Sequence, residues 1–390
     1  MDRRAFIRNI GVIGCSAAAS PLVTPVTFAS TPHDARLVVI VLRGALDGLD
    51  LVQPYGDPAL SQWRKTVSLG PEGGGHDLDG FFALHPALAD LMPLWHAGDL
   101  SVVHAVSTPY RNKRSHFDGQ DVLENGGAGA DGRSTSGGDG FLNRLLPLLG
   151  AVDTETAFAV GRERLLLLDG AAPVSSWSPD ADLDLSPQAW GLLERIYAQD
   201  PLFGDAARRA ARISAEMSGD MGPAKAGRAM ALAQFAAERL NGASRIAAFS
   251  LSGWDTHRNQ RGLLPRALSE LQTAILTLRR DLGAHWHTTT IMAITEFGRT
   301  VRENGTGGTD HGTGGALLLA GGALKGGRIH GRWPGLGEAD LFDRRDLMPT
   351  DDIRRPMAWV MRDLFGLAAA DLGSHVFPDL DLGENPHLLL

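Results

Sequence analysis

Apolar residues lie along the chain in short continuous runs, separated by longer polar or mixed stretches. The runs consist mainly of Val, Ile, Leu, Ala and Thr, which is typical of strands that are buried on both faces of a parallel sheet. We predict five such strands, at 36–42, 100–106, 245–251, 288–294 and 316–320.

The segments between these strands carry apolar residues at helical spacing. Such residues recur every three to four positions in 86–97 and again in 263–282, which predicts two helices. Strands that alternate with helices predict an α/β fold with a mostly parallel central sheet and helices on both faces. We expect 30–390 to form one such domain, with ligands bound beyond the carboxyl ends of the strands.

Two segments interrupt the alternation. Residues 126–139 (GGAGADGRSTSGGD) are rich in Gly, Ser and Asp, which predicts a mobile surface loop. Residues 173–240 combine a polar, Pro-bearing stretch with Ala-rich helical sequence. We interpret this second segment as a helical insertion or lid on the same domain.

The N-terminal segment predicts a signal peptide over 1–29. Arg3 and Arg4 precede a charge-free apolar stretch, which is the pattern of a twin-arginine leader. Pro21 and Pro25 interrupt the stretch, so it lacks the run of about 20 apolar residues that a stable transmembrane helix needs. The same arginines are also compatible with the n-region of an ordinary secretory signal. Both interpretations predict a periplasmic or secreted protein, and the first makes the twin-arginine export machinery a partner.

Composition excludes several kinds of chemistry. Cys15, the only cysteine, lies in the leader, so we expect no disulfide, zinc-thiolate site or cysteine nucleophile in the mature chain. Val12 to Cys15 also resembles a short lipidation box, which leaves a lipid anchor as the less favoured alternative. Removing the leader, which carries +2, changes the formal charge from −8 to −10. An acidic chain without basic tracts indicates no role in nucleic-acid binding.

Acidic residues and histidines follow the predicted strands closely. Because the ends of parallel strands meet at one edge of a sheet, we expect these side chains to converge there. Carboxylates and imidazoles on Gly-flanked loops are suitable ligands for a divalent metal ion such as zinc, manganese or calcium. The candidate metal ligands are Asp47, Asp255, His257, Glu296, Asp310 and His311.

A second candidate group follows the strand at 100–106. Ser115 is expected near the N-terminus of a helix, where backbone N–H groups favour an anion, and Ser115, His116 and Arg114 are the candidate catalytic residues. Arg111 and Lys113 lie nearby. Alternatively, Ser115 is only the N-cap of that helix, with Asp118 as the third residue of a capping box.

Two further residues have structural interpretations. His104 lies inside a predicted strand, which favours a hydrogen-bonded core histidine over a ligand. Arg299 could pair with Glu296, three residues earlier, or bind substrate, and we favour the pairing.

The chain resembles a widespread exported family, domain of unknown function 1501, from about Leu37 to the C-terminal region. The motifs that carry the resemblance are the twin-arginine leader, VLRGALDGLD, LDGFFALHPAL, RSHFDGQD, SGWDTH, TEFGRT and GGTDHGTGGALLLAGGALKGGRIHG. This family in turn resembles a distant branch of the alkaline-phosphatase and sulfatase superfamily, whose core is a parallel α/β sandwich with metals at the strand ends.

The resemblance implies roles for individual residues. Asp47 would match the first metal carboxylate, Ser115 the nucleophile, Asp255 and His257 a metal-binding pair, and His311 the last metal histidine. Two departures stand out: one residue separates Asp255 from His257 where the superfamily has three, and Glu296-Phe297 stands where it has Asp-His. Phenylalanine cannot bind a metal, so either one of two metals is missing or His116 or Asp310 substitutes.

These observations support two hypotheses of different classes. The first is an exported metal-dependent hydrolase of phosphate or sulfate esters, with a small anionic ester as substrate. The second is a catalytically inactive binding or assembly protein that keeps the alkaline-phosphatase-like fold. Members of this family are commonly encoded beside another exported family, which the resemblance makes a possible partner.

Overall fold

A central sheet organises the structure, a computed structural model that describes residues 34–67, 70–111, 114–127, 138–150, 156–161, 165–177 and 227–390. The predicted leader and most of the predicted loop at 126–139 lie outside these residues. Among the described residues, nine strands form the sheet in the order β11-β5-β10-β9-β1-β8-β6-β7, with β12 paired to β5. The bounds are β1 Arg36–Arg43, β5 Leu100–Ser107, β6 Ala157–Val160, β7 Ser175–Trp177, β8 Ile246–Ser252, β9 Thr289–Ile294, β10 Gly315–Ala320, β11 Arg328–His330 and β12 Asp351–Asp352.

All five predicted strands are confirmed as β1, β5, β8, β9 and β10. The pairings of β1 with β8 and β9, of β6 with β7 and β8, and of β5 with β11 and β12 are parallel. β10 alone runs antiparallel to its neighbours β5 and β9. The loop 295–314, which joins β9 to β10, therefore begins and ends at the same edge of the sheet.

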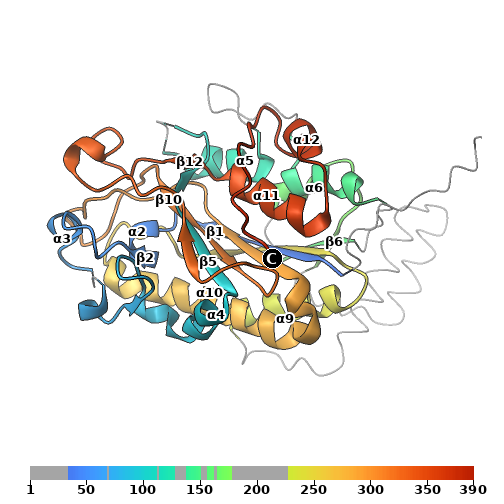
Figure 1. Cartoon of the computed structure of the whole chain (residues 1–390), viewed down its shortest axis with the longest axis horizontal. Helices are drawn as coiled ribbons and strands as arrows, with labels where there is room; N and C mark the ends of the chain where they lie inside the picture. Colours follow the sequence, from blue (N-terminus) through green and yellow to red (C-terminus); the bar gives the residue numbers. More distant parts are fainter. Residues whose placement is uncertain are drawn as a thin grey trace, which may run out of the picture.

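Helices cover both faces of this sheet, as predicted (Figure 1). α4, α9 and α10 lie on one face, and α5, α6, α11 and α12 lie on the other. A small three-stranded sheet, in the order β2-β4-β3, lies beside α2 and α3. The helices are α2 Gly48–Leu51, α3 Leu60–Trp63, α4 Met92–Ala97, α5 His116–Asn125, α6 Phe141–Leu145, α9 Arg228–Asn241, α10 Gln260–Leu282, α11 Arg354–Phe365 and α12 Ala369–Asp371, and the small sheet comprises β2 Val52–Gln53, β3 His76–Asp77 and β4 Ala83–Leu84.

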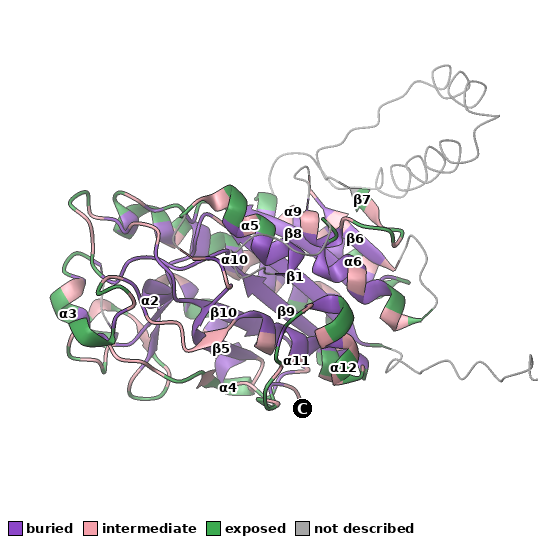
Figure 2. Cartoon of the chain, turned by 90° about the horizontal axis from the view of Figure 1, so that it is seen from above, coloured by how far each residue is buried: buried purple, intermediate pink, exposed green. Residues whose placement is uncertain are grey.

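Strand β1 shows how the sequence produces the two layers. Successive side chains of a strand point to opposite faces. Val38, Ile40 and Leu42 accordingly pack in the core cluster that contains α9 and α10. Leu37, Val39 and Val41 pack in the cluster that contains α6 and α11. The continuous apolar run is thus required because both faces are covered, and Figure 2 shows the sheet buried throughout its centre.

The predicted insertion at 173–240 falls partly outside the described residues, which omit 178–226. Its two ends belong to the main layers, because β7 continues the central sheet and α9 packs against α10. Leu232 and Phe235 of α9 are buried in the core. The helix expected at the end of this range is therefore α9, which packs in the core of the domain.

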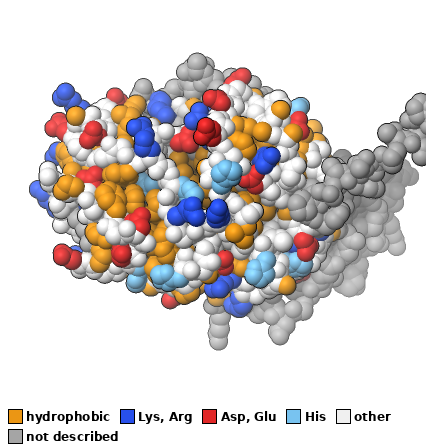
Figure 3. All heavy atoms as spheres, viewed as in Figure 1, with side chains coloured by type: hydrophobic (Ala, Val, Ile, Leu, Met, Phe, Trp, Pro, Cys, Tyr) orange, Lys and Arg blue, Asp and Glu red, His pale blue; other side chains and the backbone are white. Residues whose placement is uncertain are grey.

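None of the described helices is long and apolar enough to cross a membrane. On the face shown in Figure 3, acidic and basic side chains are interspersed among apolar ones.

His104 is a core histidine, as predicted. Its side chain is buried, Nε2 lies 3.1 Å from the Val52 carbonyl oxygen, and Nδ1 accepts a hydrogen bond from the Ala105 N–H at 2.9 Å. Nε2 must therefore carry the proton and donate to Val52. Burial lowers the pKa of His104 from 6.5 to about 4.

This pKa predicts a loss of stability in acid. The unfolded chain takes up a proton near pH 6.5 that the folded chain resists until about pH 4, so stability is full above pH 6.5 and falls as the pH is lowered between these values. Between pH 7 and pH 5 we expect the free energy of unfolding of His104→Gln to fall by about 2 kcal/mol less than that of the parent. Urea unfolding followed by circular dichroism at both pH values measures this difference. The exposed His375→Gln serves as control, and equal losses in parent and His104→Gln would contradict the assignment.

Candidate metal centre

Four chain segments meet at the carboxyl edge of the central sheet. They follow β1, β5 and β8 and fill the loop between β9 and β10. The three strands run in the same direction, and the antiparallel β10 returns from that edge. All the predicted site residues come from these segments or from the first residue of α5.

Two glycines allow the segments to approach closely. Gly44 has a φ of +121°, and a Cβ atom there would lie 2.7 Å from the Asp255 backbone nitrogen. A Cβ atom at Gly308 would lie 2.3 Å from the His257 carbonyl carbon. Side chains at either position would force the backbones apart. The Gly-rich character of these loops thus brings Asp255 and His257 to their neighbours.

Three histidines surround one carboxylate oxygen. Asp255 Oδ1 lies 3.1 Å from His257 Nε2, 3.3 Å from His311 Nε2 and 3.5 Å from His116 Nε2. The Nε2 atoms of His257 and His311 are 2.9 Å apart. Ligand-type atoms of His116, Asp255 and His311 all lie within 4.8 Å of one another. We call these four residues, His116, Asp255, His257 and His311, the His/Asp cluster.

Each of the three imidazoles uses its other nitrogen to bind an oxygen outside the cluster. The Nδ1 atom of His116 lies 2.8 Å from Glu296 Oε1, that of His257 lies 3.0 Å from Asp310 Oδ1, and that of His311 lies 2.9 Å from the Arg114 carbonyl oxygen. A backbone carbonyl oxygen and the oxygens of an ionised carboxylate can accept hydrogen bonds but cannot donate them. Each Nδ1 must therefore carry the proton of its hydrogen bond. In the neutral ring, each Nε2 then presents a bare lone pair toward the cluster.

This donor set fits a divalent cation. A hydrogen bond from Nδ1 to a carboxylate or backbone carbonyl is the arrangement that orients metal-bound histidines. Tetrahedral donors at the Zn–N distance of about 2.0–2.1 Å lie about 3.3–3.4 Å apart. Asp255 Oδ1 lies 3.1, 3.3 and 3.5 Å from the three Nε2 atoms, which is close to that separation. His116 Nε2 is shielded from solvent and makes no hydrogen bond among the described residues. A cation would satisfy that nitrogen and separate the two facing imidazoles.

Arg299 holds the carboxylate of the cluster in place. Its guanidinium is buried, and Nη2 donates to Asp255 Oδ1 at 2.6 Å. Burial acts to raise the pKa of Asp255, but the hydrogen bond and charge of Arg299 outweigh it and lower the pKa. The expected pairing of Arg299 with Glu296 is therefore wrong, because the guanidinium is turned toward the segment after β8.

Glu296 and Phe297 support His116 from behind. Glu296 is buried and also accepts from the Gly44 N–H at 2.9 Å. Its hydrogen bond raises the pKa of His116 against the opposing effect of burial. The Phe297 ring stacks on the His116 ring, with centroids 5.3 Å apart. Phe297, which cannot bind a metal, thus packs against His116, whose imidazole has a nitrogen that can.

The predicted metal ligands fall into three groups. Asp255, His257 and His311 belong to the cluster, while Glu296 and Asp310 contact it through the Nδ1 atoms of histidines. The Asp47 side chain contacts neither the His/Asp cluster nor the two acids beside it. Its buried carboxylate binds Arg64 at 2.6 Å and 3.0 Å and Gln260 at 2.7 Å. The assignment of individual ligands stays a prediction.

Ser115 immediately precedes helix α5, near its N-terminus as expected, and its hydroxyl acts as the N-cap. Its Oγ accepts from the Asp118 N–H at 3.4 Å. The expected reciprocal contact of Asp118 is replaced, because the Ser115 N–H donates to the Tyr110 hydroxyl at 2.8 Å. Arg114 is exposed, and its carbonyl oxygen lies 2.9 Å from His311 Nδ1. The predicted catalytic role of Ser115 remains a prediction.

Arg111 and Lys113 also came from this segment. Arg111 donates to the carbonyl oxygens of Thr108 and Tyr110. Lys113 lies outside the described residues.

Sequence reasoning missed two buried polar residues. Arg64 follows α3 in a polar stretch and pairs with Asp47 through a side chain that is 1% exposed. Gln260, the first residue of α10, also donates to Asp50 at 2.8 Å and accepts from Thr309 at 2.7 Å. Burial and the Asp47 charge raise the pKa of Asp50 to about 6. No local pattern marks either residue, since their partners are distant in sequence.

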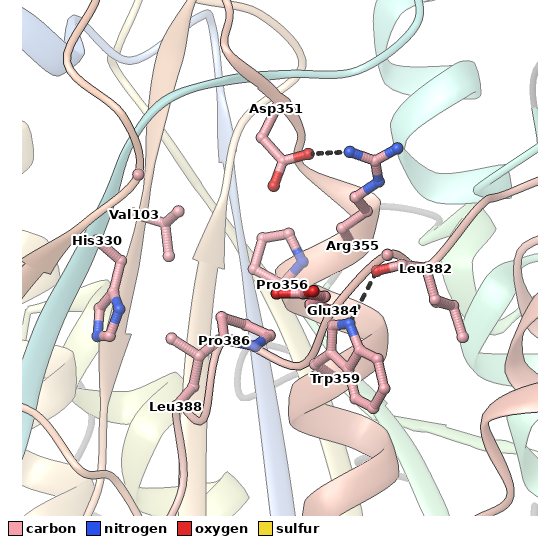
Figure 4. Close-up of a pocket in the computed structure, with 12 residues that line it drawn as sticks. Val103, His330, Asp351, Arg355, Pro356, Trp359, Leu382, Glu384, Pro386 and Leu388 are labelled. Atoms are coloured by element: carbon pink, nitrogen blue, oxygen red, sulfur yellow. Dashed lines mark hydrogen bonds and ion pairs between the residues drawn. The ribbon is translucent and has the colours of Figure 1, made fainter.

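A separate cavity of about 250 Å³ lies between β5, β11, α11 and the C-terminal segment. Figure 4 shows Asp351 facing Arg355, which it binds at 2.8 Å, and His330 across the cavity from Trp359. None of the predicted site residues lines it.

Comparisons with known proteins identify a family and a set of distant structures. The profile described as "Protein of unknown function (DUF1501)" matches residues 85–372. No curated protein matches the sequence.

Three solved structures are similar to this chain. The C-terminal periplasmic domain of EcEptC from Escherichia coli has 12% identity, a TM-score of 0.39 and coverage of 91% of this chain and 92% of that one. The same domain in complex with Zn has 12% identity, a TM-score of 0.37 and coverages of 75% and 74%. An alkaline phosphatase superfamily protein from Vibrio parahaemolyticus has 14% identity, a TM-score of 0.37 and coverages of 77% and 62%. Likeness at this level assigns neither an activity nor a ligand to this chain.

The buried guanidinium of Arg299 gives a testable prediction. We expect Arg299→Met to destabilise the protein by about 3–5 kcal/mol, because the change leaves Asp255 without its cation and several buried carbonyls without a donor. Thermal and urea unfolding measure the loss. Arg279→Met, at an exposed position of α10, is the matched control. A loss below about 1 kcal/mol in Arg299→Met would show that the network is not needed for stability.

Proposed function

The chain belongs to the DUF1501 family, and from this premise we propose that it is an exported metal-dependent hydrolase of phosphate or sulfate esters. One observation supports the proposal above all others. Three imidazole Nε2 atoms, each freed by a hydrogen bond at Nδ1, converge on the Asp255 carboxylate.

The donor set favours some metals over others. Imidazole nitrogens suit zinc and manganese better than calcium, which prefers a shell of oxygen ligands. We therefore propose zinc or manganese at the His/Asp cluster, with His116 in addition to the predicted Asp255, His257 and His311. The contacts of Glu296 and Asp310 suit roles as orienting groups for His116 and His257.

The chemistry follows from the ion and the fixed side chains around it. When bound, a divalent ion polarises the ester oxygen and makes a nucleophile easier to deprotonate. His257 and His311 present their Nε2 lone pairs toward the Asp255 carboxylate, where they would hold the ion, because their Nδ1 protons are engaged. Arg299 keeps the Asp255 carboxylate ionised by lowering its pKa. The nucleophile is water or the Ser115 hydroxyl, and Arg114, exposed beside the cluster, would offset developing negative charge.

The N-terminal sequence supports export. We propose that the twin-arginine machinery delivers the folded chain to the periplasm or the exterior. Folding before export would allow the metal to bind in the cytoplasm. An exported protein of the family that is commonly encoded beside this one is the proposed protein partner.

One observation favours a second candidate function. The Ser115 hydroxyl caps helix α5 by accepting from the Asp118 N–H, so Ser115 has a structural role that requires no catalysis. A metal-stabilised binding or assembly protein without catalysis would have this arrangement. The two candidates differ in whether the metal-loaded protein turns over an ester.

Metal analysis of the full chain, purified after export through its native route, tests the metal site. We expect about one zinc or manganese ion per chain in the parent and a loss of at least ten-fold in His311→Ala, because a ligand is removed. His96→Ala, at an exposed position of α4, is the matched control and should keep the metal. Equal metal content in His311→Ala and the parent would exclude this site.

Activity then separates the two candidates. We expect the parent to hydrolyse at least one member of a panel of aryl phosphate monoesters, diesters and sulfates, with at least a ten-fold loss in His311→Ala. Ser115→Ala distinguishes the nucleophiles, since retained turnover points to water. Flat rates with a full metal complement would contradict the hydrolase and support the binding role.

A further inference from the structure

A cavity of about 240 Å³ is lined in part by Asp310, which contacts His257 of the His/Asp cluster. It is lined mainly by arginines and polar groups from α3, the loop before β10 and the segment 341–345. The lining residues are Trp63, Thr300, Arg302, Glu303, Asn304, Asp310, Leu341, Arg344 and Arg345. We call this cavity the arginine cavity.

The three arginines differ in how they are held. Arg345 Nη1 donates to the His311 carbonyl oxygen at 2.9 Å and to Asp346 at 2.8 Å. The Arg302 guanidinium lies 4.5 Å from the centre of the Trp63 ring. Among the described residues, the guanidinium groups of Arg302 and Arg344 form no hydrogen bond or ion pair. Their donors are therefore available to an anion inside the cavity.

The two acids in the lining already have partners. Glu303 accepts from the N–H and hydroxyl of Thr66 and from the N–H of Val67. Asp310 Oδ1 accepts from Asn304 Nδ2 at 3.1 Å and faces His257. Burial acts to raise the pKa of Asp310, but the Asn304 hydrogen bond and His257 lower it. These carboxylates are satisfied without using Arg302 or Arg344.

The backbone that carries Arg344 adopts an unusual conformation. Asp343 and Arg344 have φ values of 51° and 52°, in the left-handed region that non-glycine residues rarely occupy. The turn is closed by backbone hydrogen bonds between Phe342 and Asp346, both at 2.9–3.0 Å. Such conformations carry an energetic cost and are concentrated at ligand-binding sites.

Two contacts link the arginine cavity to the His/Asp cluster. Asp310 lines the cavity and also binds His257 Nδ1. Arg345 lines it and holds the carbonyl of His311. Asp310 and Arg345 thus belong to the cavity lining and also contact histidines of the cluster.

We propose that the arginine cavity binds a second anionic group of the substrate, a phosphate, sulfate or carboxylate other than the one that reacts. The substrate class is then a polyanionic ester. This substrate assignment rests on the proposed hydrolase function, whereas the binding of an oxyanion in the cavity does not.

Calorimetric titration of the full chain with inorganic sulfate tests the anion site directly. We expect Arg344→Gln and Arg302→Gln each to weaken sulfate binding by about ten-fold, since each removes a charge-assisted hydrogen bond. Both side chains are exposed and unbonded, so the variants should fold, which circular dichroism checks. Arg279→Gln is the matched control and should bind as the parent does.

The same titration in the His311→Ala background separates this proposal from the hydrolase. Sulfate binding that persists there, and is still weakened by Arg344→Gln, supports the arginine cavity even if no metal or activity is found. Binding that His311→Ala abolishes and the arginine variants leave unchanged would place the anion at the His/Asp cluster and overturn the proposal. Undetectable sulfate binding in the parent would also overturn it.

Kinetics test the substrate class. Arg344→Gln should raise the KM for an aryl phosphate that bears a ring carboxylate by about ten-fold, with little change for the uncharged-ring analogue. Equal changes for the two esters would refute a second anion subsite while leaving hydrolysis itself intact.

Discussion

The buried guanidinium of Arg299 is the interaction on which the candidate site depends. It donates to backbone carbonyls of Gly44 and Ala45 after β1, of Trp254 after β8 and of Thr309 in the loop before β10. Three segments that are far apart in sequence are thus fixed around one cation. A buried charge requires this degree of satisfaction, because an unpaired one costs several kcal/mol. Asp255 supplies the compensating negative charge and is held where the histidines meet it.

Around this point the site is built in two layers. The inner layer presents Nε2 atoms and one carboxylate oxygen, and the outer layer presents oxygens that accept the Nδ1 protons. The outer oxygens engage Nδ1 of each ring, so they leave Nε2 as the nitrogen that is available to the inner layer. The arginine cavity adjoins the outer layer at Asp310, and its positive charges extend the candidate site beyond the His/Asp cluster.

The strands and the edge of the sheet were predictable because their signals are local. A continuous apolar run such as 36–42 is needed wherever both faces are covered, and the acids and histidines after such runs necessarily share an edge. Partners were not predictable. Arg299 was expected to pair with Glu296, three residues away, yet it pairs with Asp255, forty-four residues earlier. Asp47 likewise has the sequence context of a ligand but is used by Arg64.

The sequence by itself determined the α/β architecture, the strands that carry the site and the supply of carboxylates and imidazoles at their ends. Only the tertiary structure decided which of these groups face one another, because the contacts join β1, β8, α5 and the loop before β10 across large separations. Hydrophobic periodicity records which face of an element is buried. It contains no information on which buried cation a given carboxylate meets. Asp255 pairs with Arg299 and belongs to the His/Asp cluster, whereas Asp47 pairs with Arg64 and lies outside it.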